Sequence, residues 1–278
     1  MTGFSLATSM ADLHRLAGSG SLIAGGTDLL VQMRDGREEA HLIDISNIED
    51  APPAVDIDGG FVELSALAPI SHVVAGLDGR LPGITAAARV FGSLQIRNRA
   101  TIGGNLANAS PAADLVPPLV AADADLVIDG PKGERTVPAG DFATGPGRTV
   151  LEADEWVRSV RMPLPEGEEG FRKLGNRSAM VISIVSLAWR WNRSADGTLR
   201  AVKLALGAVA PTVIRVPEAE DALEGRRPTE DVVTTAAESL RAAIDPIDDV
   251  RGSAWYRRQV AGDLLREALA GQQGAHRR

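Results

Sequence analysis

Two segments with paired glycines constrain the fold more than any other feature of this sequence: AGGTD at Ala24–Asp28 and TIGGN at Thr101–Asn105. The first lies between an expected strand and an expected helix that begins with Thr27 as its N-cap. Glycine lets the backbone come close to a ligand and tolerates positive φ, and a helix N-terminus offers free N–H groups to an anion. The two turns together indicate a phosphorylated cofactor, although ordinary tight turns remain the alternative. Neither turn matches the Walker or GxGxxG patterns.

Apolar periodicity and turn residues predict strands and helices that are grouped rather than strictly alternating, which favours an α+β fold over a doubly wound sheet. The expected helices are 8–17, 28–35, 70–77, 81–91, 112–122, 229–243 and 253–270. The expected strands are 22–24, 41–45, 55–57, 61–66, 125–128, 135–137, 156–162, 181–191 and 199–209. Proline, glycine and glutamate dominate residues 163–170, and we place a domain boundary there.

Composition excludes several classes of function. The net charge of −8 disfavours a nucleic-acid partner, because phosphate backbones bind basic surfaces. The chain has no cysteine and only four scattered histidines, so we expect no metal site, no iron–sulfur cluster and no cysteine nucleophile on it. No apolar run approaches the roughly 20 residues of a membrane span. The start of the chain lacks the features of a signal peptide, and we expect a cytoplasmic protein.

The amino-acid sequences of the two turns and of several later segments resemble those of one protein family. AGGTDLL followed by TIGGNLANASPAAD, together with ELSALAPISHV, FRKLGNRSAMVISIV and WYRRQVAGDLLREAL, is similar to the FAD-binding medium subunits of the xanthine dehydrogenase and carbon monoxide dehydrogenase family. The resemblance implies an α+β fold with a PCMH-type FAD-binding domain over 1–168, in subdomains of roughly 1–52 and 53–168. A C-terminal α+β domain of the carbon monoxide dehydrogenase flavoprotein type would occupy 169–278.

The resemblance also implies which residues contact FAD. The first turn would wrap the pyrophosphate and the second would hold its other side. Asp114 would contact FAD hydroxyls, and Lys173 would lie close to the cofactor. The full expected set is Leu22, Ile23, Ala24, Gly25, Gly26, Thr27, Asp28, Leu29, Phe91, Gln95, Thr101, Ile102, Gly103, Gly104, Asn105, Asn108, Asp114 and Lys173. From the residues alone, Asp114 could instead cap a helix, Phe91 could be a core residue, and Lys173 could be a solvated charge.

In that family the implied function is electron relay by an oxidoreductase subunit that is active only in a complex, expected to be a heterotrimer. A large molybdopterin-binding subunit would hydroxylate the substrate, and a small subunit with [2Fe-2S] clusters would pass electrons to FAD on this chain. NAD+ or another acceptor would then receive them. No catalytic acid–base residues are expected here, because the cofactor supplies the chemistry. Two alternatives stay open: a self-sufficient FAD-dependent oxidase or reductase of the same fold, and a non-catalytic nucleotide-binding module.

Overall fold

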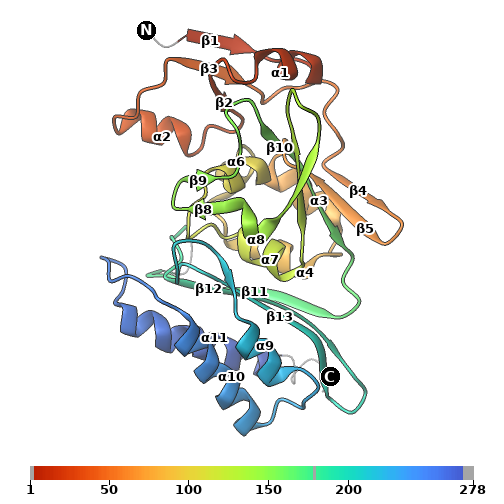
Figure 1. Cartoon of the computed structure of the whole chain (residues 1–278), viewed down its shortest axis with the longest axis vertical. Helices are drawn as coiled ribbons and strands as arrows, with labels where there is room; N and C mark the ends of the chain where they lie inside the picture. Colours follow the sequence, from red (N-terminus) through yellow and green to blue (C-terminus); the bar gives the residue numbers. More distant parts are fainter. Residues whose placement is uncertain (1–2, 178–179, 272–278) are drawn as a thin grey trace. The chain divides into compact units, whose positions relative to one another are not determined.

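The computed structural model describes residues 3–177 and 180–271, which form two compact units of mixed helix and sheet (Figure 1). Unit 1 comprises the described parts of Met1–Asp78, Gly92–Ala109 and Ala124–Pro163, and unit 2 those of Gly79–Phe91, Ser110–Asp123 and Leu164–Arg278. The expected α+β class is confirmed. Among the described residues, no helix combines the length and apolar character needed to cross a bilayer.

Unit 1 begins with a small parallel sheet in the order β1-β3-β2. Its strands and the helices that connect them are β1 (Gly3–Leu6), α1 (Met10–Leu16), β2 (Ser21–Ile23), α2 (Leu29–Arg34) and β3 (His41–Asp44). Ser9 caps α1 by accepting a hydrogen bond from Asp12 N at 3.1 Å. Apolar side chains that include Leu13 and Ile43 form a core with Trp156 of β10, described below.

The second sheet of unit 1 is antiparallel, in the order β4-β5-β10-β6-β7. Its strands are β4 (Val55–Asp58), β5 (Phe61–Ser65), β6 (Asp125–Asp129), β7 (Arg135–Pro138) and β10 (Trp156–Pro163). The remaining elements of the unit are α3 (Ile70–Leu77), α5 (Leu94–Arg97), α6 (Ile102–Ala107), α8 (Ala139–Phe142), β8 (Ala143–Gly145) and β9 (Arg148–Thr149). Helix α3 buries Ile70, Val73 and Leu77, which lie on one face at helical spacing.

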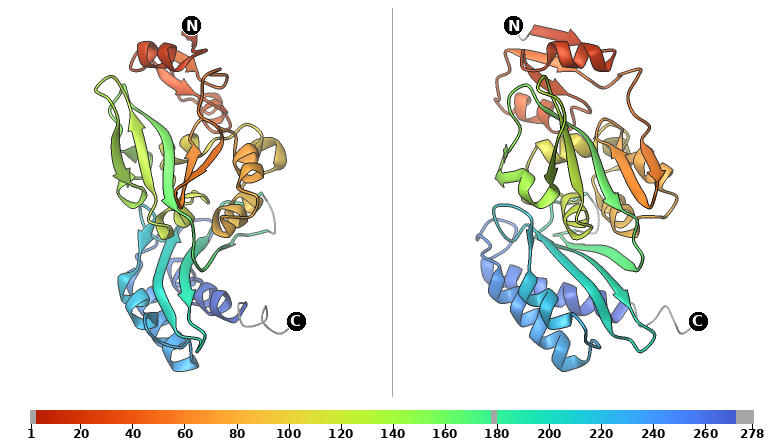
Figure 2. Two further views of the ribbon diagram at one scale, coloured as in Figure 1. Left: turned by 90° about the vertical axis from the view of Figure 1, so that its right-hand side faces the viewer. Right: turned by 45° about the vertical axis from the view of Figure 1, so that its right-hand side comes forward.

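Unit 2 is built on a four-stranded antiparallel sheet in the order β11-β12-β13-β14. Its elements are α4 (Pro82–Val90), α7 (Val116–Ala121), β11 (Glu168–Leu174), β12 (Val185–Arg193), β13 (Leu199–Gly207), β14 (Ile214–Arg215), α9 (Pro217–Leu223), α10 (Glu230–Ala243) and α11 (Ala254–Gly271). Figure 2 shows the C-terminal helices grouped beside this sheet: α9 contacts β13, α11 contacts β11 and β12, and α10 packs against α9 and α11. Helices α4 and α7 contact the same strands and complete the unit.

The core of unit 2 is centred on two stacked indoles of β12, Trp189 and Trp191, whose ring centroids are 5.9 Å apart. Trp191 is fully buried, and its Nε1 donates a hydrogen bond to the Glu168 carboxylate at 2.8 Å. The same carboxylate accepts from Arg193 Nε at 2.9 Å. The indole therefore fills apolar space while its single polar group is satisfied.

Two expectations about local structure are wrong. The helix expected over 112–122 is shortened to α7, and Asp114 lies outside it. Thr27 does not cap α2; Asp28 occupies the N-cap position and, within the described residues, makes no side-chain capping bond. Strand β11 begins inside the segment 163–170, where the sequence predicts a domain boundary.

Removal of the central indole tests the core. Trp191→Ala is expected to lower the free energy of unfolding by about 3–5 kcal/mol, as large-to-small changes of buried aromatics do. Trp255→Ala is the matched control, because that indole is 68% exposed and its loss should change stability by less than about 0.5 kcal/mol. Urea unfolding of the two variants measures both values. Equal effects would contradict the assignment of Trp191 to the core.

Candidate functional site

The first glycine turn follows the carboxyl end of β2 in the parallel sheet, which is the edge where ligands bind in open sheets of this kind. Gly26 has φ +67°, in the left-handed region that glycine adopts without strain. Leu22 and Ala24 pack against the core of this part of unit 1. The turn can therefore offer a ligand mainly its backbone.

That backbone carries a row of unused donors. Within the described residues, no protein group accepts a hydrogen bond from the amides of Ala24, Gly25, Gly26, Thr27 or Asp28. The first amide after them that is engaged is that of Leu30, which donates to Gly26 O at 3.2 Å. Backbone N–H groups need an acceptor, and consecutive free ones in a turn suit an anion such as a phosphate.

Gly25 brings the two turns together. A Cβ built on Gly25 would collide with the carbonyl group of Arg99 and lie 2.9 Å from Ala100 N. The first turn thus packs backbone to backbone against the residues that immediately precede Thr101. The sequence predicted two turns that serve one ligand, and within unit 1 they are neighbours.

The second turn is itself the start of helix α6. Thr101 caps the helix, its Oγ1 accepting from Gly104 N at 2.9 Å, while Gly103 N donates to Ala66 O at 3.0 Å. Asn105 N donates to Thr101 O at 3.0 Å. These three amides are already paired, so this turn would contact a ligand through its surface and side chains. Ile102 is buried and lies in the core.

Two groups of the second turn, a glycine and a side-chain oxygen, are available to contact a ligand. Gly104 is exposed, and among the described residues the only atom near a Cβ built on it is Thr101 Oγ1, at 3.2 Å. The side-chain oxygen of Asn105 is buried yet has no hydrogen-bond partner in the part of the chain that the structure describes. An unpaired buried oxygen is costly, and a bound donor such as a hydroxyl or ring N–H would relieve that cost.

A side-chain network also links the turns. Gln32 Nε2 of helix α2 donates to the Asp28 carboxylate and to Asn108 Oδ1, the latter at 3.2 Å. Asp28 is the last residue of the first turn, and Asn108 is the C-cap of α6. The Asp28 carboxylate, expected near the helix start, is thus held by Gln32 one turn further along. The sequence did not identify Gln32, because one of its two partners, Asn108, lies 76 residues further along the chain.

Gln95 and Phe91 are two members of the expected set that lie outside the turns. Gln95 is exposed on the short helix α5 of unit 1, between the exposed side chains of Leu94 and Ile96. Phe91 belongs to unit 2, where it is the half-buried C-cap residue of α4. Phe91 is therefore not among the fully buried core residues.

In unit 2, Asp114 and Lys173 form a buried ion pair. Their carboxylate oxygen and Nζ are 2.6 Å apart, and the side chains are only 9% and 7% exposed. Ser183 Oγ donates to the other oxygen of Asp114 at 2.7 Å, and Lys173 Nζ also donates to Val181 O at 3.0 Å. Lys173 is thus no solvated charge, and Asp114 makes no helix-capping bond, since Leu115 is the N-cap of α7.

Burial raises the pKa of Asp114 above its ordinary value, while the charge of Lys173 and hydrogen bonds from Lys173 and Ser183 oppose that rise. A desolvated carboxyl with a single charged partner is a candidate for function. The sequence predicted both members of the pair but not Ser183, because a serine in an apolar strand segment gives no signal of its own.

Two family models cover nearly the whole chain. The FAD-binding domain in molybdopterin dehydrogenase matches residues 2–165, and the carbon monoxide dehydrogenase flavoprotein C-terminal domain matches residues 170–271. The chain belongs to this family of FAD-binding subunits. It is an FAD-dependent oxidoreductase subunit of the molybdenum hydroxylase type, so the expected family and cofactor are confirmed.

Relatives match along most of their length. The carbon monoxide dehydrogenase medium chain of Hydrogenophaga pseudoflava is 31% identical over 95% of this chain and 93% of its own. The xanthine dehydrogenase FAD-binding subunit of Escherichia coli O157:H7 is 30% identical, over 90% of this chain and 87% of its own length. Among solved structures, carbon monoxide dehydrogenase from Hydrogenophaga pseudoflava, in a form lacking the Mo-pyranopterin moiety, superposes with a TM-score of 0.89. That match has 32% identity and covers 97% of this chain and 96% of the other.

The residues of unit 1 fit the diphosphate-containing cofactor of this family. FAD carries an anionic pyrophosphate, for which the free amides of residues 24–28 are suitable donors. It also carries hydroxyl and ring N–H donors, for which the unpaired oxygen of Asn105 is a suitable acceptor. The absence of a side chain at Gly104 leaves room for close approach.

The adjacent glycines of α6 make a matched pair of test sites. Gly104→Val should change the stability of the FAD-free protein by no more than about 0.5 kcal/mol, because valine is only a slightly better helix former than glycine and its Cβ would meet only Thr101 Oγ1, at 3.2 Å. FAD retention should be lost, since the valine side chain would occupy the open face. Gly103→Val should instead lower stability by about 1–3 kcal/mol, because its Cβ would lie 2.8 Å from Ala66 O.

Thermal unfolding of the FAD-free proteins and their flavin content after purification distinguish the two glycines. Full flavin content in Gly104→Val would contradict the placement of FAD at this turn.

Proposed function

We propose that this chain is the FAD-carrying electron-transfer subunit of a molybdenum hydroxylase complex. A large molybdopterin-binding subunit would hydroxylate the substrate, and a small subunit would supply electrons from [2Fe-2S] clusters. NAD+ or another acceptor would take the electrons up. Family membership along the whole chain and relatives that are medium chains of such enzymes support this proposal.

The single observation that carries the proposal is the row of unpaired amides at residues 24–28, packed by Gly25 against the start of the second turn. These amides, with Thr27, would hold the pyrophosphate. Thr101 and Gly104 would flank it, and Asn105 and Asn108 would offer polar side-chain groups. The Thr101 hydroxyl keeps its own proton to donate, because its oxygen accepts the Gly104 amide.

In unit 2 we propose that Asp114 accepts hydrogen bonds from FAD hydroxyls, with Lys173 close to the cofactor. Phe91 and Gln95 would line the flavin pocket. The domain division proposed from the sequence, 1–168 and 169–278, fits the extents of the two family models.

A bound flavin can accept electrons singly and release them in pairs, so no acid–base pair is required of the protein. The residues of this chain bind and orient the cofactor. A self-sufficient oxidase and a non-catalytic nucleotide-binding module gain no support from the relatives, whose names are those of subunits of multi-subunit dehydrogenases.

Asn105 provides a direct test of FAD binding. Asn105→Ala is expected to weaken FAD binding by ~1–3 kcal/mol, because the buried side-chain oxygen would lose a bound partner. Asn47→Ala is the matched control, since that exposed side chain in the same unit has no hydrogen bond among the described residues. Fluorescence titration of the FAD-free protein gives both constants, and an unchanged affinity in Asn105→Ala would remove this residue from the site.

Purification of the chain from its own cells tests the whole proposal. FAD in near-equal proportion, with iron–sulfur absorbance from a co-purifying small subunit and a large subunit that contains molybdenum, is the expected result. Reduction of NAD+ by the substrate-reduced complex would identify the acceptor. FAD in a chain without partners that turns over a small substrate alone would favour the self-sufficient enzyme. A folded chain that takes up no FAD would contradict the proposed function.

A further inference from the structure

The Asp114–Lys173 pair of unit 2 is held by a wider set of contacts. Ile184 N donates to Leu174 O at 2.8 Å, so the ends of the segment between β11 and β12 are fixed. Ser183, which donates a hydrogen bond to Asp114, is the residue immediately before Ile184. Its side chain is 1% exposed, and the hydroxyl has no other partner among the described residues. The serine therefore orients one specific carboxylate oxygen.

Arg257 of helix α11 joins the two backbone stretches that carry this cluster. Its Nη1 donates to Ile184 O and to Ala208 O, both at 2.8 Å. Ile184 follows Ser183, and Ala208 N in turn donates to Pro111 O at 2.8 Å, three residues before Asp114. One guanidinium thus connects Ile184, the residue after Ser183, with Ala208, which is bonded to the segment that carries Asp114.

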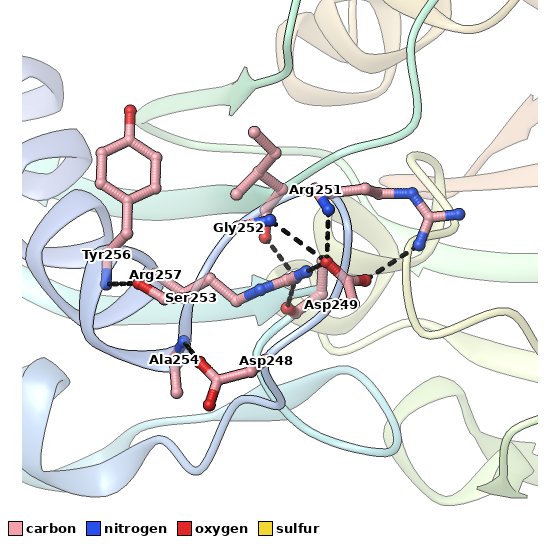
Figure 3. A network of polar contacts seen from close by, with 10 residues as sticks. Asp248, Asp249, Arg251, Gly252, Ser253, Ala254, Tyr256 and Arg257 are labelled. Carbon is pink, nitrogen blue, oxygen red and sulfur yellow. Dashed lines mark hydrogen bonds and ion pairs between the residues drawn. The ribbon is translucent and has the colours of Figure 1, made fainter.

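The guanidinium is itself fixed. Arg257 is 3% exposed, and its Nη2 lies 2.7 Å from the Asp249 carboxylate, which also accepts from Arg251 N and Gly252 N (Figure 3). Partial burial would raise the pKa of Asp249, but hydrogen bonds from Arg251 N and Arg257 outweigh it and lower the pKa to about 2. Asp249 is therefore ionised at neutral pH and balances the buried charge of Arg257.

We propose that Ser183 and Arg257 are positioning residues for the pair of Asp114 and Lys173: Ser183 orients the Asp114 carboxylate, and Arg257 fixes the backbone at Ile184 and at Ala208, which is bonded to Pro111. The inference rests on the proposed role of Asp114 and Lys173 at FAD. It explains why a helix at the end of the chain places a buried arginine against these two carbonyl groups. An arginine suits this role better than lysine, because its planar fork donates in several fixed directions at once.

The test uses the full chain, freed of FAD and titrated with FAD. Ser183→Ala should raise the Kd for FAD about tenfold, the loss expected for a hydrogen bond to a charged group. It should also change the visible circular dichroism of the bound flavin at saturation. Ser183→Thr keeps the hydroxyl and should restore both. Ser186→Ala is the control, because that serine is equally buried and its Oγ has no partner among the described residues.

A double-mutant cycle separates positioning from general stability. Asp114→Asn should also raise the Kd, and Ser183→Ala should add nothing in that background, because its effect passes through Asp114. A folded Ser183→Ala with the Kd and dichroism of the wild type would overturn the inference. So would full additivity of the two substitutions, or an Asp114→Asn that binds FAD as the wild type does.

Arg257 is tested against its neighbour. Arg257→Lys should raise the Kd several-fold, whereas Arg258→Lys should leave it within twofold, since Arg258 pairs with the fully exposed Asp245. A folded Arg257→Lys with wild-type affinity would overturn the role of Arg257. If the wild type itself fails to bind FAD, the proposed function fails first, and the two failures are thereby distinguished.

Discussion

The backbone contact between Gly25 and the Arg99–Ala100 peptide is the constraint on which the binding region of unit 1 depends. Any side chain at residue 25 would enter the space of that peptide. The contact sets the free amides of the first turn beside the start of the second, where the unpaired oxygen of Asn105 lies. Glycine at such a position costs conformational entropy, and the cost is offset when close backbone approach creates a site that side chains would block.

The candidate residues of unit 2 differ from those of unit 1, because they are charged side chains rather than backbone amides. Burying the Asp114–Lys173 pair removes both groups from water, a cost that ion pairing alone often fails to recover. The structure offsets that cost with a hydroxyl donor to the acid and a carbonyl acceptor for the lysine. A buried pair held by such hydrogen bonds specifies one arrangement of its segments, which suits the cofactor contact proposed for it.

The sequence predicted best those helices and strands whose formation is determined by neighbouring residues in the chain. Helix α3 matches its expected bounds, because Pro69 precedes it and its apolar residues recur at helical spacing. Helix α6 was not predicted, since Gly103 and Gly104 are poor helix formers and the cap at Thr101 supports the helix only in the folded chain. Strand β1 was missed because its four residues alternate too briefly to be recognised.

The candidate site shows the same difference between features with local causes and features that depend on the folded chain. A region built from backbone amides leaves a visible trace in the sequence, because only glycine permits the required approach, and both turns were found that way. A network built from side chains leaves no such trace: Ser183, Gln32 and Arg257 are ordinary residues whose partners lie far away in the sequence. Glycine patterns therefore indicate the class of cofactor, whereas the residues proposed to orient its contacts become apparent only when the fold brings them together.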